Sequence, residues 1–153
     1  MKQAPIAQEE IILCRVFQAP RHLVWGAWTQ ASQIAQWFGP HGFSNPVCEW
    51  DAVPGGLIRI HMRDPNGNVY PMTGKFREVR ENSRLVFVAT PEDDDGNELM
   101  VSLTTVDFAA KDGGTEVTLR ADAVALTEIA TLMLQGMRAG WTQSLERLAA
   151  LLN

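Results

Sequence analysis

Large apolar residues recur at a helical interval near the C-terminus. Met133, Met137 and Trp141 are the clearest example. A step of four residues turns an α-helix by only about 40°, so these three side chains share one face. Polar residues such as Gln135 and Thr142 fall on the other side. The pattern predicts an amphipathic helix over 126–152, and it fits either a wall beside a cavity or an ordinary core helix.

The N-terminal part of the chain predicts one strand and two short helices. Residues 9–17 have the β-branched and aromatic content typical of a strand. Pro20 can open a helix, because its missing N–H would have no partner in the first turn. Val24, Trp25 and Trp28 then recur with helical spacing. A second short helix is expected over 31–36, before glycine and proline interrupt regular structure.

From residue 46 onward the sequence predicts strands separated by turn residues, over 46–51, 56–63, 68–79, 83–90, 99–109 and 114–122. The connections are short, so successive strands should pair antiparallel. In one of them Ile58, Ile60 and Met62 alternate with polar residues, which predicts a sheet with one buried face.

The strand over 99–109 has an inconsistent pattern. Val101 and Leu103 have one parity, whereas Val106 and Phe108 have the other. Because alternate residues of a strand face opposite sides of the sheet, both pairs cannot be inward in a regular strand. A β-bulge would reconcile them, although the sequence does not place it.

A curved antiparallel sheet with one apolar face needs a cover, and 126–152 is the only long amphipathic element available for it. The chain is therefore predicted to be an α+β fold in which the terminal helix lies in the concave face of the sheet. A length of 153 residues suits one domain over 1–153 with a substantial core.

The net charge and the hydropathy of the chain argue against two classes of binding partner, nucleic acids and membranes. The net charge is −5 and no basic stripe is present, so a nucleic-acid partner is not expected. No apolar run approaches the ~18–20 residues that span a bilayer, so no membrane insertion is predicted. Residues 1–8 lack the layout of a signal peptide, which predicts a cytoplasmic protein. Cys14 and Cys48 form no metal or redox motif and are expected to be small core residues.

Several short motifs together resemble a known family. They are Arg15-x-Phe17-x-Ala19-Pro20-Arg21-x-x-Val24-Trp25, Trp37-Phe38-Gly39-Pro40, Pro54-Gly55-Gly56, Tyr70-x-Met72-x-Gly74, Arg84-Leu85-Val86-Phe87 and Gly140-Trp141. In order and spacing they are similar to SRPBCC domains of the START-like superfamily. More narrowly, they resemble bacterial proteins named after the activator of the heat-shock chaperone ATPase. The resemblance implies a helix-grip fold, in which the sheet wraps around the C-terminal helix and encloses a hydrophobic tunnel.

Methionine and aromatic residues supply the candidate lining of such a tunnel. Methionine adapts to irregular shapes and is common on surfaces that accept varied apolar partners. The predicted ligand-binding residues are Trp37, Trp50, Met62, Tyr70, Met72, Phe87, Met133, Met137 and Trp141. The alternative is that these side chains simply fill the core. Gly140 costs on the order of 1 kcal/mol in a helix interior, so either the sheet approaches closely there or space is kept open for a ligand.

No catalytic constellation, metal site or cofactor is predicted. The three histidines lack metal-ligand spacing, and the acidic stretch 92–98 is typical of a solvated hairpin tip, because it lacks the ligand pattern of a calcium loop. The leading hypothesis is binding of a small hydrophobic molecule (a lipid, a sterol-like or an aromatic, polyketide-like compound). The first alternative is a cyclase- or aromatase-like enzyme with Tyr70 or His41 as a proton-transfer group. The second, ranked last, is a chaperone co-activator that acts through a protein surface. The oligomeric state is left open.

Overall fold

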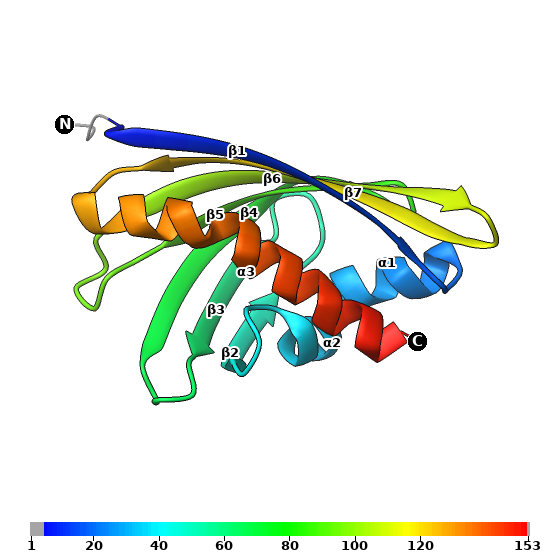
Figure 1. The fold of residues 1–153 in the computed structure, drawn as a ribbon, viewed down its shortest axis with the longest axis horizontal. Coiled ribbons are helices and arrows are strands. Elements are labelled where there is room, and N and C mark those ends of the chain that lie inside the picture. The colour runs from blue at the N-terminus through cyan, green and yellow to red at the C-terminus, as the bar shows by residue number, and fades with distance from the viewer. Residues whose placement is uncertain (1–4, 153) are drawn as a thin grey trace.

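Seven strands form one antiparallel sheet that curves around a long helix (Figure 1). The computed structural model describes residues 5–152. The elements in chain order are β1 (Ala7–Phe17), α1 (Arg21–Thr29), α2 (Ala31–Trp37), β2 (Ser44–Trp50), β3 (Leu57–Arg63), β4 (Val69–Arg80), β5 (Arg84–Pro91), β6 (Met100–Lys111), β7 (Gly114–Ala125) and α3 (Glu128–Leu152). The predicted α+β class and helix-grip arrangement are confirmed. The predicted spans differ from the observed elements by only a few residues at their ends.

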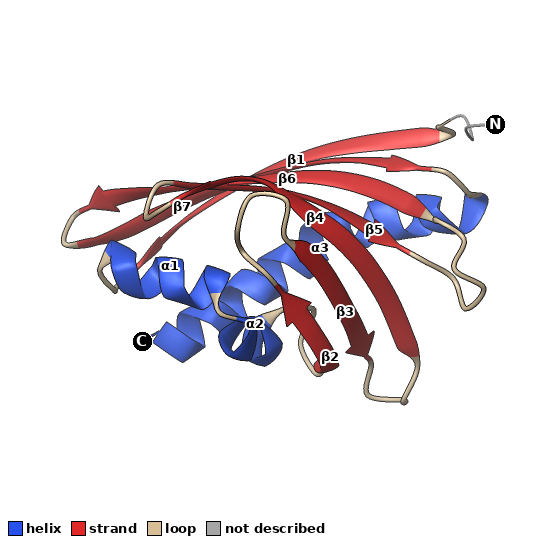
Figure 2. Cartoon of the chain, turned by 180° about the vertical axis from the view of Figure 1, so that it is seen from behind, coloured by secondary structure: helices blue, strands red, loops and turns tan. Residues whose placement is uncertain are grey.

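The strand order is β1-β7-β6-β5-β4-β3-β2, so β2 to β7 form a meander and β1 returns to pair with the last strand. β1 and β7 pair from Ala7↔Ala125 to Phe17↔Thr115 without a break. The helices α1 and α2 connect the two edge strands and lie on the same side of the sheet as α3 (Figure 2). None of the helices within residues 5–152 is long and apolar enough to cross a membrane.

The sheet bends steeply between its β1 side and its β2 side, which gives it a concave face (Figure 2). Register shifts between Ser44 and Val47 and between Phe76 and Glu78 interrupt two of the ladders, and such irregularities increase local twist. Gly74 also contributes, because a Cβ atom at this position would lie 2.2 Å from the backbone oxygen of Val88. The two strands can approach this closely only at a glycine.

β6 contains no bulge where the sequence suggested one. It pairs with β7 in unbroken register from Met100↔Ala125 to Lys111↔Gly114. Alternate residues from Met100 to Phe108 are buried, so Ser102 and Thr104 face inward, whereas Val101 and Leu103 are half-buried on the outer face. The hydrophobic pattern was misleading because two inward positions carry hydroxyl groups.

Eight aromatic residues are connected by ring–ring contacts, and we refer to them as the aromatic cluster: Trp28, Trp37, Phe38, Trp50, Phe76, Phe87, Phe108 and Trp141. The ring centroids of Trp28 and Trp37 are 4.7 Å apart at 66°, and those of Trp50 and Phe76 are 5.1 Å apart at 86°. These edge-on geometries are favourable for aromatic quadrupoles. The indole N–H groups of Trp37 and Trp50 donate to the backbone oxygens of Ala27 and Trp28.

The two cysteines occupy different environments, and the prediction that both are core residues is wrong for Cys14. Cys14 is exposed, because its side chain has the outward parity of β1, next to Thr118 on β7. Cys48 is half-buried, and its burial raises the pKa of the thiol to about 11.

Candidate functional site

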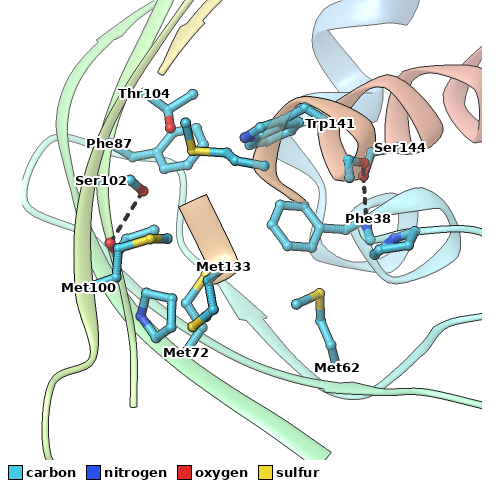
Figure 3. Close-up of a pocket in the computed structure, with 16 residues that line it drawn as sticks. Phe38, Met62, Met72, Phe87, Met100, Ser102, Thr104, Met133, Trp141 and Ser144 are labelled. Atoms are coloured by element: carbon cyan, nitrogen blue, oxygen red, sulfur yellow. Dashed lines mark hydrogen bonds between the residues drawn. The ribbon is translucent and has the colours of Figure 1, made fainter. Parts of the chain in front are cut away.

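A cavity of about 190 Å³ lies between the sheet and residues 133–144 of α3 (Figure 3). Strands β3 to β6, helix α3 and the loop after α2 all contribute to its wall. The wall consists of Phe38, Gly39, Pro40, Met62, Met72, Phe87, Ala89, Pro91, Met100, Ser102, Thr104, Met133, Met137, Gly140, Trp141 and Ser144. None of these side chains is ionisable, so the interior is apolar with a few hydroxyl groups.

Methionines dominate this wall. Of the six methionines in the chain, Met1 lies outside the described residues. The other five line the cavity: Met62 from β3, Met72 from β4, Met100 from β6, and Met133 and Met137 from α3. Figure 3 shows Met62, Met72, Met100 and Met133 around the same space. Because thioether side chains are flexible and polarizable, such a surface can adapt to ligands of different shape. We refer to this space as the methionine cavity.

Gly140 keeps part of this cavity open. A Cβ atom at this position would meet no heavy atom within 4 Å, so the sheet does not pack closely against the helix there. Of the two explanations for this glycine, close packing is therefore wrong, and open space beside the helix is what the structure shows. A Cβ atom at Gly136, one turn earlier, would also meet no heavy atom within 4 Å, but Gly136 is exposed and does not line the cavity.

Arg147 fixes the loop that forms one rim of the cavity. Its Nη1 donates to the backbone oxygens of Phe38, Gly39 and Pro40 at 3.1–3.2 Å, and its Nη2 donates to that of Gln36 at 3.0 Å. Gln36 lies in the last turn of α2, where backbone oxygens have no partner within the helix, and the other three oxygens belong to the loop that follows. The guanidinium is partly buried, and desolvation lowers its pKa.

Ser144 and Gln143 attach the same loop to α3. The backbone N–H of Gly39 donates to Ser144 Oγ at 3.0 Å, and Ser144 Oγ itself donates to the backbone oxygen of Gly140 at 3.0 Å. The backbone N–H of His41 donates to Gln143 Oε1 at 3.0 Å. The rim is therefore held by directed hydrogen bonds and not only by apolar contact.

Six of the nine predicted ligand-binding residues lie on the cavity wall: Met62, Met72, Phe87, Met133, Met137 and Trp141. Trp37 and Trp50 do not. They are 0% and 5% exposed and lie within the aromatic cluster, where neighbouring rings and the backbone acceptors of their N–H groups fill the surrounding space.

Tyr70 also lies away from the cavity. Its side chain is 43% exposed, its ring lies 6.0 Å from that of Phe43, and its hydroxyl donates to Asp64 Oδ2 at 3.0 Å. This hydrogen bond to a carboxylate raises the pKa of Tyr70. Hydrogen bonds from Asn68, Tyr70 and Asn66 lower the pKa of Asp64. The phenol therefore stabilises the 64–68 turn and does not point toward a bound molecule.

His41 lies beside the rim, but its ring faces α3. Its Nε2 is 3.3 Å from Glu146 Oε2, and both side chains are about half exposed. Neither His41 nor Tyr70 belongs to the cavity wall, so the geometry gives no support to a proton-transfer role for either group. No group of three metal-ligating side chains is present within residues 5–152.

Sequence reasoning did not select several wall residues. Phe38, Gly39 and Pro40 belong to a motif used only for the family resemblance, and Met100 is not among the predicted ligand-binding residues. Ser102 and Thr104 were missed because their hydroxyl groups contradicted the expected apolar parity of β6. In β6, the polar residues at inward positions mark the part of the strand that faces the cavity.

Comparison with known proteins places this geometry in a family. The model of the family described as Activator of Hsp90 ATPase homolog 1-like protein matches residues 18–153. No curated protein matches the chain. Among solved structures, protein CV1439 from Chromobacterium violaceum is 27% identical, with a TM-score of 0.78 over 94% of this chain and 96% of that chain. Protein NE0264 from Nitrosomonas europaea is also 27% identical, with a TM-score of 0.78 over 94% of this chain and 93% of that chain.

Proposed function

The chain belongs to the family of Activator of Hsp90 ATPase homolog 1-like proteins, and from this premise we propose that it binds a small hydrophobic molecule in the methionine cavity without transforming it. The observation that carries the proposal is the convergence of all five methionines other than Met1 on one cavity. They come from three strands and one helix that are distant in sequence. Side chains that only fill a core are close-packed, whereas these flexible side chains surround open space.

The size of the cavity limits the ligand. Its volume of about 190 Å³ exceeds the roughly 150 Å³ of an engineered apolar cavity that binds benzene. It is smaller than the roughly 300–1,000 Å³ of typical ligand pockets. Among the ligand classes considered from the sequence, a compound with one or two rings or a short acyl chain fits this volume. A sterol or a long-chain lipid would require the methionine side chains to move apart.

Two features favour binding over the other hypotheses. The groups proposed for cyclase-like proton transfer, Tyr70 and His41, do not reach the cavity. The family description refers to activation of a chaperone ATPase, but we find no feature of residues 5–152 that points to a chaperone. The proposal therefore rests on the cavity.

A pair of glycine variants tests the proposal. Gly140 lines the cavity and Gly136 does not, yet both lie on α3, and at neither position would a Cβ atom meet a heavy atom within 4 Å. Gly140→Leu should fill the cavity, whereas Gly136→Leu makes the same chemical change on the exposed face. The probe is 2-methylnaphthalene, and the readouts are thermal stability and calorimetric affinity.

We expect the probe to raise the melting temperature of the wild-type protein and of Gly136→Leu, because a ligand that binds only the folded state stabilises it. The Gly140→Leu protein should remain folded and lose most of this response. Equal binding by the two variants, or no response of the wild-type protein to the probe, would contradict the proposal.

A further inference from the structure

The hydroxyl of Thr104 is a buried polar group in the wall of the methionine cavity. Thr104 is 1% exposed and lies in the middle of β6, between Phe87 on β5 and Ala121 on β7. In Figure 3 its oxygen points toward the ring of Phe87 and the interior of the cavity, and no hydrogen bond joins it to another residue drawn. Nor does it bond to any other residue between 5 and 152. Because this oxygen faces the cavity and has no partner among these residues, it is available to a ligand.

The other two hydroxyl groups of the wall are already engaged. Ser102 Oγ donates to the backbone oxygen of Ala89 at 3.3 Å. Ser144 Oγ accepts from the Gly39 N–H and donates to the Gly140 oxygen. Thr104 is therefore the hydroxyl of the wall whose donor proton remains unused within the described residues.

The charges around the cavity disfavour an anion. The wall contains no cationic side chain, and the donors of nearby Arg147 are directed at four backbone oxygens. The acidic hairpin tip 92–98 joins two wall residues, Pro91 and Met100, and carries five carboxylates. A carboxylate in this cavity would lose its hydration without gaining a counter-charge.

Building on the proposed function, we infer that the ligand is a neutral apolar molecule with one hydroxyl or carbonyl oxygen, and that this oxygen pairs with the hydroxyl of Thr104. The oxygen fixes the orientation of the molecule, and the methionines accommodate the remainder. Thr104 is thus the residue that determines which apolar molecules bind best.

Three probes of similar shape test this inference by titration calorimetry. They are 2-naphthol, 2-methylnaphthalene and 2-naphthoate. One hydrogen bond made in place of an apolar contact should favour 2-naphthol over 2-methylnaphthalene by roughly threefold to tenfold. The carboxylate of 2-naphthoate should make it the weakest of the three.

Thr104→Val removes the hydroxyl and keeps the branched shape of the side chain. It should abolish the preference for 2-naphthol and leave the affinity for 2-methylnaphthalene unchanged. Its melting temperature should equal or exceed that of the wild-type protein, because the lost hydroxyl has no protein partner. The control is Thr105→Val, on the outer face of the same strand, which should retain the preference.

The outcomes separate the two proposals. If neither 2-naphthol nor 2-methylnaphthalene binds, the proposed function fails and this inference fails with it. Equal binding of these two probes, unchanged in Thr104→Val, would preserve the function and overturn the role of Thr104. Binding of 2-naphthoate as tight as that of 2-naphthol would overturn the requirement for a neutral ligand. A lowered melting temperature of Thr104→Val would show that the hydroxyl is already bonded within the protein.

Discussion

The aromatic cluster and the methionine cavity lie under the same sheet and share Phe38, Phe87 and Trp141 at their boundary, yet one is filled and the other is open. In the aromatic cluster, Trp28 and Trp37 are fully buried and pack edge to face at 4.7 Å. In the methionine cavity, Met62 and Met133 are only half-buried around an open volume of about 190 Å³. Both regions are apolar, so hydropathy alone does not distinguish them.

The difference is one of side-chain stiffness and backbone support. Aromatic rings have few rotamers and interlock in fixed geometries, whereas methionine has three rotatable bonds and holds no single shape. Helix α3 contributes residues to both regions. Its C-terminal residues Leu145 and Leu148 are buried in the core, and Gly140 leaves space at the cavity. Under the proposed function, the aromatic cluster stabilises the fold and the methionine cavity binds the ligand.

The largest effect is expected from Trp28→Ala. Trp28 packs against Trp37, Phe108 and Trp141, so its removal should lower the free energy of unfolding by about 3–5 kcal/mol. Urea denaturation measures this change. The half-buried Met62 is the comparison, and Met62→Ala should cost only about 1 kcal/mol, well below the value for a fully buried methionine. Equal costs would show that the two regions are not energetically distinct.

Arg147→Met should have the next largest effect. It keeps an apolar stem and removes the four hydrogen bonds to the rim loop, so we expect a loss of about 2 kcal/mol in unfolding free energy. Weaker binding of 2-methylnaphthalene should accompany this loss, because the loop forms part of the cavity wall. Arg138→Met is the control, since Arg138 is exposed on the same helix. A comparable loss in both variants would argue against a specific function of Arg147 at the rim.

Gly140→Ala should stabilise the protein by about 1 kcal/mol. The methyl group enters open space, and alanine is favoured over glycine in a helix by about that amount. Gly136→Ala should give a similar gain on the exposed face, and thermal denaturation compares the two. Destabilisation by Gly140→Ala alone would mean that the sheet closes onto the helix in solution.

The smallest effect concerns Tyr70, the single tyrosine of the chain. Its hydrogen bond to Asp64 raises the phenol pKa, so the protonated form is favoured in the folded state. The hydrogen bond contributes its full stabilising free energy below the ordinary phenol pKa, and this contribution is lost as the pH rises through the raised pKa of Tyr70. Ultraviolet absorbance titration measures this pKa directly, and Asp64→Asn should lower it. An unchanged pKa in Asp64→Asn would show that Tyr70 does not donate to that carboxylate.

The fold was predictable from the sequence because its main signals are local. Turn residues separate the strands, Ile58 and Ile60 alternate with polar neighbours, and the helical spacing of Met133, Met137 and Trp141 marks α3. Each of these patterns depends on the geometry of one element. The prediction failed in β6, where the inward side chains of Ser102 and Thr104 face a cavity and so need not be apolar.

The site was only partly predictable, since the cavity wall depends on how distant elements meet. Trp37 and Met62 have equally apolar side chains, but the first is enclosed by α1 and the aromatic cluster and the second faces open space. Tyr70 has the same parity as Met72 on β4, yet it lies near the strand end and bonds to the adjacent turn. No local pattern in the sequence separates these cases.

The central claim is that the methionine cavity binds a small apolar molecule, and the methionine methyl groups report on it directly. In protein labelled with ¹³C at the methionine methyl groups, NMR should show six signals, of which five belong to residues of the cavity wall. Titration with 2-methylnaphthalene should shift those five together. If the five signals stay in place at saturating probe, the cavity does not bind apolar molecules and the account is wrong.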